Sequence, residues 1–212
     1  MGRIEELCAY LDKCRTLADV GCDHGYCTEF ALDRGICERA VIADISAKSL
    51  SKAQKLLAPY IEEGRVKSVC CDGLEGISAD VDEVLIAGMG GEEIIKILSS
   101  AFIPEKFVFQ PMKNAPLLRR YLIERGCAIV RDDIIEDGKY YFVIKGERAG
   151  KMAEYSEVEL EFGRDSLKNP IFASYAATEL EKKQTYLGGC GEGAECSSLK
   201  RQIALLKEAL GA

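Results

Sequence analysis

The chain has 212 residues, of which 48% are hydrophobic and 30% are charged, and this composition is ordinary for a globular protein of one sizeable domain plus a small extension. It has no apolar run near the roughly 20 residues that a membrane helix needs, and its charged N-terminus lacks the apolar stretch of a signal peptide. We therefore expect a cytoplasmic protein without a membrane partner. The net charge of −7 disfavours a general nucleic-acid binder, although it leaves room for a local basic patch.

The sequence predicts an α/β domain, because strand-like apolar runs alternate with helix-length segments. The expected strands are Thr16–Val20, Ala40–Ala43, Val66–Cys71, Val81–Ala87 and Lys106–Gln110. Helix signals lie between them: an N-cap at Ser46, a segment from Glu92 to Ser99, and a segment from Ala115 to Arg125 before Gly126. Strands separated by helices of this length form a parallel sheet with right-handed crossovers.

The pattern changes after the fifth strand. Two further runs, Cys127–Ile135 and Lys139–Lys145, are joined by a turn containing Asp-Gly, which predicts an antiparallel hairpin. A parallel sheet that ends in such a hairpin is typical of the Rossmann-like class I methyltransferase sheet. Beyond it, Leu167–Leu187 and Ser198–Leu210 predict two helices around a glycine-rich break, a coiled-coil-like helical hairpin. We expect a methyltransferase domain over 1–150 and the helical hairpin over 151–212.

The ten cysteines do not predict a metal site. No Cys-x-x-Cys pair occurs, and the single histidine, His24, cannot complete a usual zinc set with those spacings. We expect reduced cysteines that act as small apolar residues, and no metal.

The turn after the first strand, Asp19-Val20-Gly21-Cys22-Asp23-His24-Gly25, is the first candidate site. A glycine-bearing strand-to-helix turn lets a cofactor approach the backbone. Asp19 and Asp23 would repel a pyrophosphate, but they suit the amino group and sulfonium of S-adenosylmethionine. A tight turn with helix-capping acids is the alternative interpretation of this motif.

The next three strand ends carry ligand-type residues at the same edge of the sheet, where open α/β sheets bind ligands. Asp44 suits the ribose hydroxyls and Asp72 the adenine amino group; Met89 could pack on the adenine, with space left by its glycine neighbours. The full set of expected cofactor contacts is Asp19, Gly21, Asp23, His24, Tyr26, Asp44, Ile45, Asp72, Gly73, Gly88, Met89 and Gly90.

The end of the fifth strand is the candidate acceptor site, because a polar side chain followed by proline can hold a planar base. We expect substrate contacts from Gln110, Pro111, Met112 and Asn114, although a strand stop before a helix explains the same residues. His24 is a candidate general base, or equally a helix cap.

Several segments resemble the bacterial tRNA (adenine-22-N1)-methyltransferases of the TrmK type, in the right order along nearly the whole chain. They are ADVGCDHGY (18–26), CDGLEGI (71–77), AGMGGEEIIKIL (87–98), QPMKNAPLLRRYLIERG (110–126), DGKYYFVI (137–144) and EFGRDSLKNPIFASYAATELEKK (161–183). The resemblance implies a Rossmann-like domain with a helical hairpin, S-adenosylmethionine as cofactor, and methyl transfer to N1 of an adenine in tRNA. That family commonly has Gln-Pro-Asn where this chain has Gln110-Pro111-Met112, and its acidic residue after strand two is often Glu rather than Asp44.

Adenine N1 has a free lone pair at neutral pH, so it needs no deprotonation before it attacks a methyl group. The enzyme must align the nucleophile, methyl and sulfur, and a carboxylate can stabilise the positive charge of the product. We expect Asp23 to be that catalytic group. The alternatives are a methyltransferase for a small molecule or a protein, and a cofactor-binding relative without catalysis.

Overall fold

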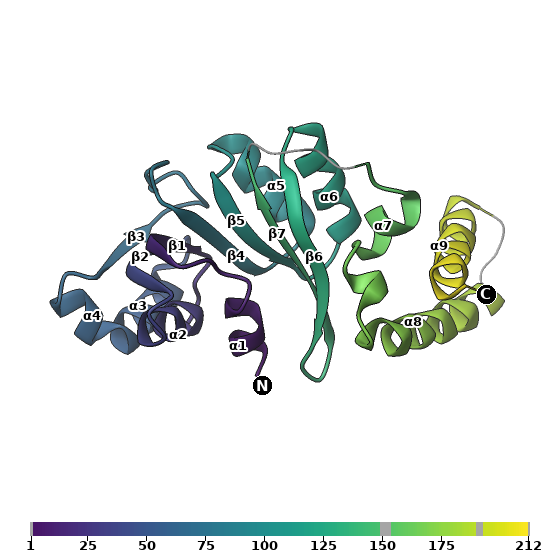
Figure 1. Cartoon of the computed structure of the whole chain (residues 1–212), viewed down its shortest axis with the longest axis horizontal. Helices are drawn as coiled ribbons and strands as arrows, with labels where there is room; N and C mark the ends of the chain where they lie inside the picture. Colours follow the sequence, from purple (N-terminus) through teal and green to yellow (C-terminus); the bar gives the residue numbers. More distant parts are fainter. Residues whose placement is uncertain (1, 149–153, 190–192, 212) are drawn as a thin grey trace.

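The computed structural model describes residues 2–148, 154–189 and 193–211, and its centre is a seven-stranded sheet (Figure 1). The strands are β1 (Cys14–Val20), β2 (Cys37–Asp44), β3 (Val66–Cys70), β4 (Glu83–Met89), β5 (Lys106–Pro111), β6 (Ala128–Glu136) and β7 (Tyr140–Glu147). Their order is β3-β2-β1-β4-β5-β7-β6. β1 to β5 pair in parallel, whereas β7 is antiparallel to both β5 and β6. The predicted parallel sheet with a terminal hairpin is confirmed.

Helices cover both faces of the sheet. α1 (Arg3–Cys8), α2 (Tyr26–Asp33) and α3 (Ala47–Leu56) pack on one face, and α5 (Gly91–Ser100) and α6 (Ala115–Glu124) pack on the other. In β4, Leu85 joins the core under α1 to α3, while its neighbours Val84 and Ile86 join the core under α5 and α6. Because alternate side chains of a strand face opposite sides, both faces of β4 are apolar and both are buried.

Local signals in the sequence explain where several elements begin and end. The Ser46 hydroxyl accepts a hydrogen bond from the Ser49 N–H at 3.2 Å and caps α3, as predicted. Gly138 has a φ of 64° in the turn between β6 and β7, a conformation that glycine adopts without steric cost. α1 and α4 (Ala58–Glu62) are not among the predicted elements, since six and five residues are too few to display a helical period.

The C-terminal part contains more helix than expected. α8 (Ile171–Gly188) begins later than the predicted Leu167, because the 3₁₀ turn η1 (Ser166–Lys168) precedes it, and α9 (Ala194–Leu210) begins before the predicted Ser198. A short helix, α7 (Glu157–Phe162), was not predicted, although Ser156 and Glu159 form a capping box at its start. The three helices share one apolar cluster: Val158, Phe162, Phe172, Ala176, Leu205 and Leu206. The expected helical hairpin is confirmed as α8 and α9, and the additional helix α7 packs with it into a three-helix unit.

This helical unit is fastened to the sheet beyond the edge strand β6 (Figure 1). Arg119 of α6 is completely buried, and its Nε donates to both carboxylate oxygens of Asp132 on β6, at 3.0 and 2.8 Å. Its Nη1 donates to the carbonyls of Leu160 and Glu161 in α7, at 3.1 and 2.9 Å. One guanidinium thus joins three elements, and we call this cluster the Arg119 anchor.

The predicted boundary between 150 and 151 lies outside the described residues, as do Cys190 and part of the glycine-rich break, and the division into two domains stays a prediction. The nine described cysteines are free. In the part of the chain that the structure describes, no helix is both long enough and apolar enough to cross a bilayer.

Candidate active site

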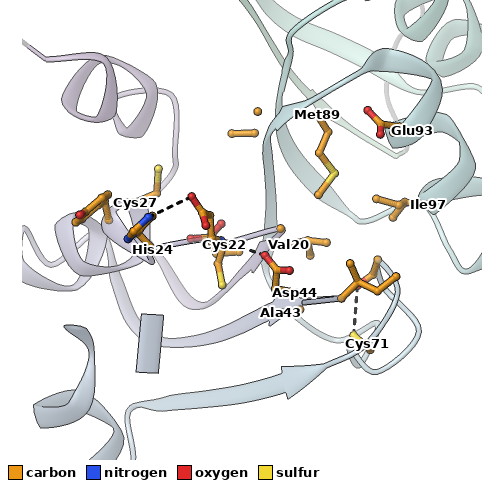
Figure 2. Close-up of a pocket in the computed structure, with 18 of the residues that line it drawn as sticks. Val20, Cys22, His24, Cys27, Ala43, Asp44, Cys71, Met89, Glu93 and Ile97 are labelled. Atoms are coloured by element: carbon orange, nitrogen blue, oxygen red, sulfur yellow. Dashed lines mark hydrogen bonds and ion pairs between the residues drawn. The ribbon is translucent and has the colours of Figure 1, made fainter. Parts of the chain in front are cut away.

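A cavity of about 690 Å³ opens at the carboxyl ends of β1 to β4 (Figure 2). Its walls include eleven of the twelve predicted cofactor contacts, namely Asp19, Gly21, Asp23, His24, Tyr26, Asp44, Ile45, Asp72, Gly73, Gly88 and Met89. The twelfth, Gly90, is not part of this wall. The volume lies within the range of about 300–1,000 Å³ that is common for small-molecule sites. The structure thus brings together residues that are up to seventy positions apart in the chain.

The turn after β1 has a backbone that only a few residue types adopt. Gly21, Asp23 and Gly25 have φ angles of 72°, 45° and 80°. Aspartate tolerates this left-handed region better than most side chains, but at some cost in strain. A Cβ on Gly21 would overlap the side-chain methyl of Met89. Met89 therefore packs against the turn at a point where glycine is required.

Asp19 lies under this turn and is only 4% exposed. Its Oδ2 accepts a hydrogen bond from the Thr28 hydroxyl of α2 at 2.7 Å. Burial raises the pKa of Asp19 to about 6, against the opposing effect of this hydrogen bond. A buried carboxylate of this kind gains from a cationic ligand group, which would restore the charged form.

Asp44 holds the turn to the end of β2. Its Oδ2 accepts a hydrogen bond from the Asp23 N–H at 3.2 Å, and its Oδ1 accepts one from the Ser46 N–H at 2.7 Å. A carboxylate has about four lone-pair sites, so Asp44 can still accept hydroxyl donors from a ligand. The two backbone bonds fix its orientation before any ligand arrives.

The far end of the cavity lies between β3 and α5. Asp72 forms an exposed ion pair with Lys96 at 3.8 Å, and the Cys71 thiol contacts the Gly73 carbonyl at 3.5 Å. Gly73 has a φ of 57°, and a Cβ there would overlap Ile97 of α5. Close packing of the segment after β3, at Gly73, against α5 therefore shapes this end.

A polar cluster lies at the start of α2. The His24 Nε2 is 3.7 Å from an Asp23 oxygen and 3.3 Å from the Lys52 ammonium nitrogen. The His24 ring stacks on Tyr26, with ring centroids 5.3 Å apart. The Asp23 side chain is 61% exposed, so it is accessible to a substrate that covers the cavity.

Sequence reasoning missed the contribution of helices α1 and α5. Arg3, Ile4 and Leu7 of α1 and Glu93, Lys96 and Ile97 of α5 also line the cavity, together with Val20, Cys22, Cys27, Ala43, Cys71 and Ala87. The Arg3 guanidinium lies over the Tyr141 ring at 5.1 Å, and the Arg3 backbone N–H donates to the Asp137 carboxylate at 3.1 Å, so the β6–β7 hairpin positions this residue. Since α1 was not predicted as a helix, no sequence signal placed Arg3 at the cavity.

The predicted acceptor residues lie beside the cavity and not in its wall. Gln110 is 1% exposed and Met112 is 49% exposed. The Met112 N–H donates to the Met89 carbonyl at 2.8 Å, which joins this segment to the end of β4. Asn114, with a φ of 57°, precedes α6 as its N-cap residue, and Pro111 ends β5.

The charges of the wall fit a cationic ligand with one anionic end. Five carboxylates line the cavity: Asp19, Asp23, Asp44, Asp72 and Glu93. The cations in the wall are Arg3 and Lys96, of which Lys96 is paired with Asp72. A sulfonium and an ammonium group match the acidic part, a carboxylate matches Arg3, and a pyrophosphate would be repelled. Gly88 faces open space, since a Cβ there would meet no atom within 4 Å, and this leaves room for the ligand.

The sheet order, its antiparallel hairpin and this acidic cavity together define a Rossmann-like methyltransferase domain. The family described as "Methyltransferase domain" matches residues 1–144, and the chain belongs to this family.

Among the similar proteins are methyltransferases that are named for a tRNA substrate. The tRNA (adenine(22)-N(1))-methyltransferase of Bacillus subtilis is 25% identical over 97% of this chain and 92% of its own length. A candidate tRNA methyltransferase of Mycoplasma pneumoniae is 31% identical over 68% of each chain. The structure is similar to that of a candidate tRNA (m1A22) methyltransferase of Streptococcus pneumoniae in complex with S-adenosyl-L-methionine. Its TM-score is 0.86 and its identity 27%, and the match covers 98% of both chains.

Proposed function

We propose that this protein transfers the methyl group of S-adenosylmethionine to N1 of an adenine in tRNA, the adenine at position 22 as in the named relatives. The observation that carries the proposal is the acidic cavity at the ends of β1 to β4, in a chain whose likeness to these relatives extends over nearly its full length. A cytosolic location belongs to the same proposal.

Three of the cavity carboxylates have distinct roles toward the cofactor. Asp19 binds the amino group of the methionine part, Asp44 accepts the ribose hydroxyls, and Asp72 accepts from the adenine amino group. Arg3 binds the methionine carboxylate. When it is bound, S-adenosylmethionine supplies a methyl group bonded to a positively charged sulfur.

The reaction needs alignment and charge stabilisation rather than proton removal. The N1 lone pair forms the new nitrogen–carbon bond while the carbon–sulfur bond breaks, with its electron pair left on sulfur. Positive charge appears on the base, and Asp23, exposed at the mouth of the cavity, stabilises it. Because N1 carries no proton, His24 is not required as a general base; it orients the Asp23 carboxylate 3.7 Å away. The base must leave its stack in the tRNA to reach this position.

Methyl transfer from radiolabelled S-adenosylmethionine to bulk bacterial tRNA, followed by nucleoside mapping, tests the proposal. We expect 1-methyladenosine at one position, and no labelling of a transcript in which that adenosine is replaced by guanosine. A protein that binds S-adenosylhomocysteine in calorimetry but labels no tRNA would instead favour a small-molecule or protein substrate.

The C-terminal helices are the proposed docking surface for the body of the tRNA. Several of their basic residues are held by neighbouring acids, since Arg164 pairs with Glu159 and Arg201 pairs with Glu157. Lys200 and Lys207 of α9 are exposed and seven positions apart, which puts them on one face of the helix. Lys168 and Lys182 are also exposed, whereas Lys151 lies outside the described residues.

A charge-reversal variant tests this surface. Lys200→Glu with Lys207→Glu should weaken tRNA binding about tenfold and should make its salt dependence shallower, since phosphate contacts release counterions. Lys67→Glu, which reverses an exposed lysine on β3 at the other edge of the sheet, is the matched control. Equal affinity and equal salt slopes for both variants would exclude α9 as a phosphate-binding face.

A further inference from the structure

The Gln110 side chain has a hydrogen-bond acceptor that nothing in the described structure satisfies. Its Nε2 donates to the Met112 sulfur at 3.5 Å, whereas its Oε1 is buried and has no donor among the described residues. A buried carbonyl oxygen without a partner costs about 1–3 kcal/mol, and such groups are rare in native proteins. An orphaned acceptor beside a candidate active site therefore calls for a ligand that brings the donor.

Gln110 lies on the side of the cavity that faces α1. In the register of β4 and β5 it is opposite Ala87, which lines the cavity. Val108 is two residues earlier, on the same face of β5, and it belongs to the core cluster that contains Leu7 of α1, another cavity residue. Gln110 is thus next to a residue of the cavity wall in the sheet and on the face of β5 that α1 covers.

Met112 is a cover over this amide that can be displaced at low cost. Its side chain is 49% exposed, and a thioether is both flexible and a weak hydrogen-bond acceptor. The bond that it receives from Gln110 Nε2 is easily exchanged for a better one.

We propose that, when the Met112 side chain moves aside, Gln110 Oε1 accepts a hydrogen bond from the exocyclic amino group of the acceptor adenine; this inference rests on the proposed function. Adenine presents an amino donor next to N1, the nitrogen that receives the methyl group. Guanine presents a carbonyl oxygen at the corresponding place, which would face the Gln110 oxygen and be repelled. Gln110 is thus the residue that selects an amino-bearing base, and Met112 limits access to it.

Substrate analogues separate this role from a structural one. The kcat/KM of wild-type protein and of Gln110→Met, which keeps the shape of the side chain, is measured on two ligated tRNAs. One carries adenosine at the mapped position and the other carries purine riboside, which lacks the amino group. The lower intrinsic reactivity of purine N1 lowers the kcat/KM of both proteins by the same factor. It therefore cancels when the adenosine-to-purine-riboside ratio of wild type is compared with that of the variant.

We expect the preference for adenosine over purine riboside to be about tenfold or more larger in wild type than in the variant, the effect of one hydrogen bond to a buried group. Calorimetry should give the same affinity of both proteins for S-adenosylhomocysteine. Equal preferences in the two proteins overturn the assignment of Gln110 alone. If wild type methylates no tRNA, the proposed function fails and this inference falls with it.

Truncation of Met112 tests the cover. Met112→Ala should lower the KM for tRNA with kcat unchanged, because no side chain has to be displaced. Leu117→Ala, which truncates a 45% exposed side chain on α6, should leave the KM unchanged. A raised KM in Met112→Ala would show that the thioether contacts the base, and it would overturn the role of cover.

Discussion

Asp23 and Asp44 are joined by one hydrogen bond, yet we propose different roles for their carboxylates. Asp44 is fixed by two backbone N–H groups and lines the cavity, whereas the Asp23 carboxylate is exposed. Asp44→Asn should weaken binding of S-adenosylhomocysteine by about 1–3 kcal/mol, the value of charge-assisted hydrogen bonds. Titration calorimetry measures this loss, and Asp80→Asn, an exposed site far from the cavity wall, is the control.

Asp23→Asn should instead lower kcat about 10- to 100-fold with a smaller change in cofactor affinity, since the lost charge acts in the transition state. Asparagine tolerates the positive φ of this position, so the substitution removes the charge and keeps the turn. Single-turnover kinetics at saturating cofactor measure the effect. Unchanged turnover would show that Asp23 does not stabilise the reaction.

The raised pKa of Asp19 predicts a pH dependence of cofactor binding. In the proposed binding mode the ammonium group of the ligand binds the ionised Asp19 carboxylate, which forms as the pH rises through its pKa of about 6. Affinity should therefore fall about tenfold between pH 7.5 and pH 5, as the fraction of ionised Asp19 falls. In the ligand-free protein the sign is opposite: the pKa of Asp19 is raised from 3.8 to about 6 by burial, so its contribution to stability is present below pH 3.8 and is lost as the pH rises to about 6. Calorimetry across this range should show the trend in wild type and a flat profile in Asp19→Asn.

At the scale of elements, the start of α5 contacts the loop between β5 and α6 through backbone atoms. Gly91, the first residue of α5, donates its N–H to the Lys113 carbonyl at 2.8 Å, and a Cβ on Gly91 would overlap the Asn114 carbonyl oxygen. Since both partners are backbone atoms, neither can move aside like a side chain.

Gly91→Ala should therefore destabilise the protein by about 1–3 kcal/mol through overpacking. It should also displace the loop between β5 and α6, and so raise the KM for tRNA. Denaturant unfolding measures the first effect. Gly2→Ala, where a Cβ meets nothing within 4 Å, provides the comparison. If Gly91→Ala unfolded at the same denaturant midpoint as wild type, the backbone overlap would be contradicted.

The sequence could predict the elements whose signals are local. The alternating runs and the Asp-Gly turn predicted the sheet and its hairpin, and the glycines and acids at successive strand ends predicted the part of the cavity wall formed by β1 to β4. What it could not predict depends on contacts between distant segments. α1 is short and contacts the β6–β7 hairpin through Arg3 and Tyr141. No local sequence pattern predicts this contact. Likewise, the burial of Gln110 under Met112 follows from the end of β5 lying beside β4.

At the scale of the whole molecule, the Arg119 anchor joins the sheet to the C-terminal helices. Removal of one partner from a buried ion pair leaves the other charge without compensation. Arg119→Met should therefore lower the free energy of unfolding by about 3–5 kcal/mol, whereas Arg119→Met with Asp132→Leu should recover much of that loss. Chemical denaturation of the single and double variants measures both values. A double variant no more stable than the single one would show that the carbonyl contacts to α7, and not the ion pair, hold the unit.

The Arg119 anchor also limits which C-terminal segments of other methyltransferases can replace the C-terminal helices of this enzyme. Arg119 and Asp132 lie well before residue 150, yet Arg119, paired with Asp132, donates to backbone carbonyls of α7. A chimera that replaces everything after residue 150 with the tail of another methyltransferase keeps the buried Arg119 guanidinium. The new tail then has to provide backbone carbonyls that accept its hydrogen bonds. Such grafts should succeed only when donor and host share this arginine and this aspartate. The C-terminal helices therefore depend on two residues from α6 and β6, and a functional exchange has to include all of them.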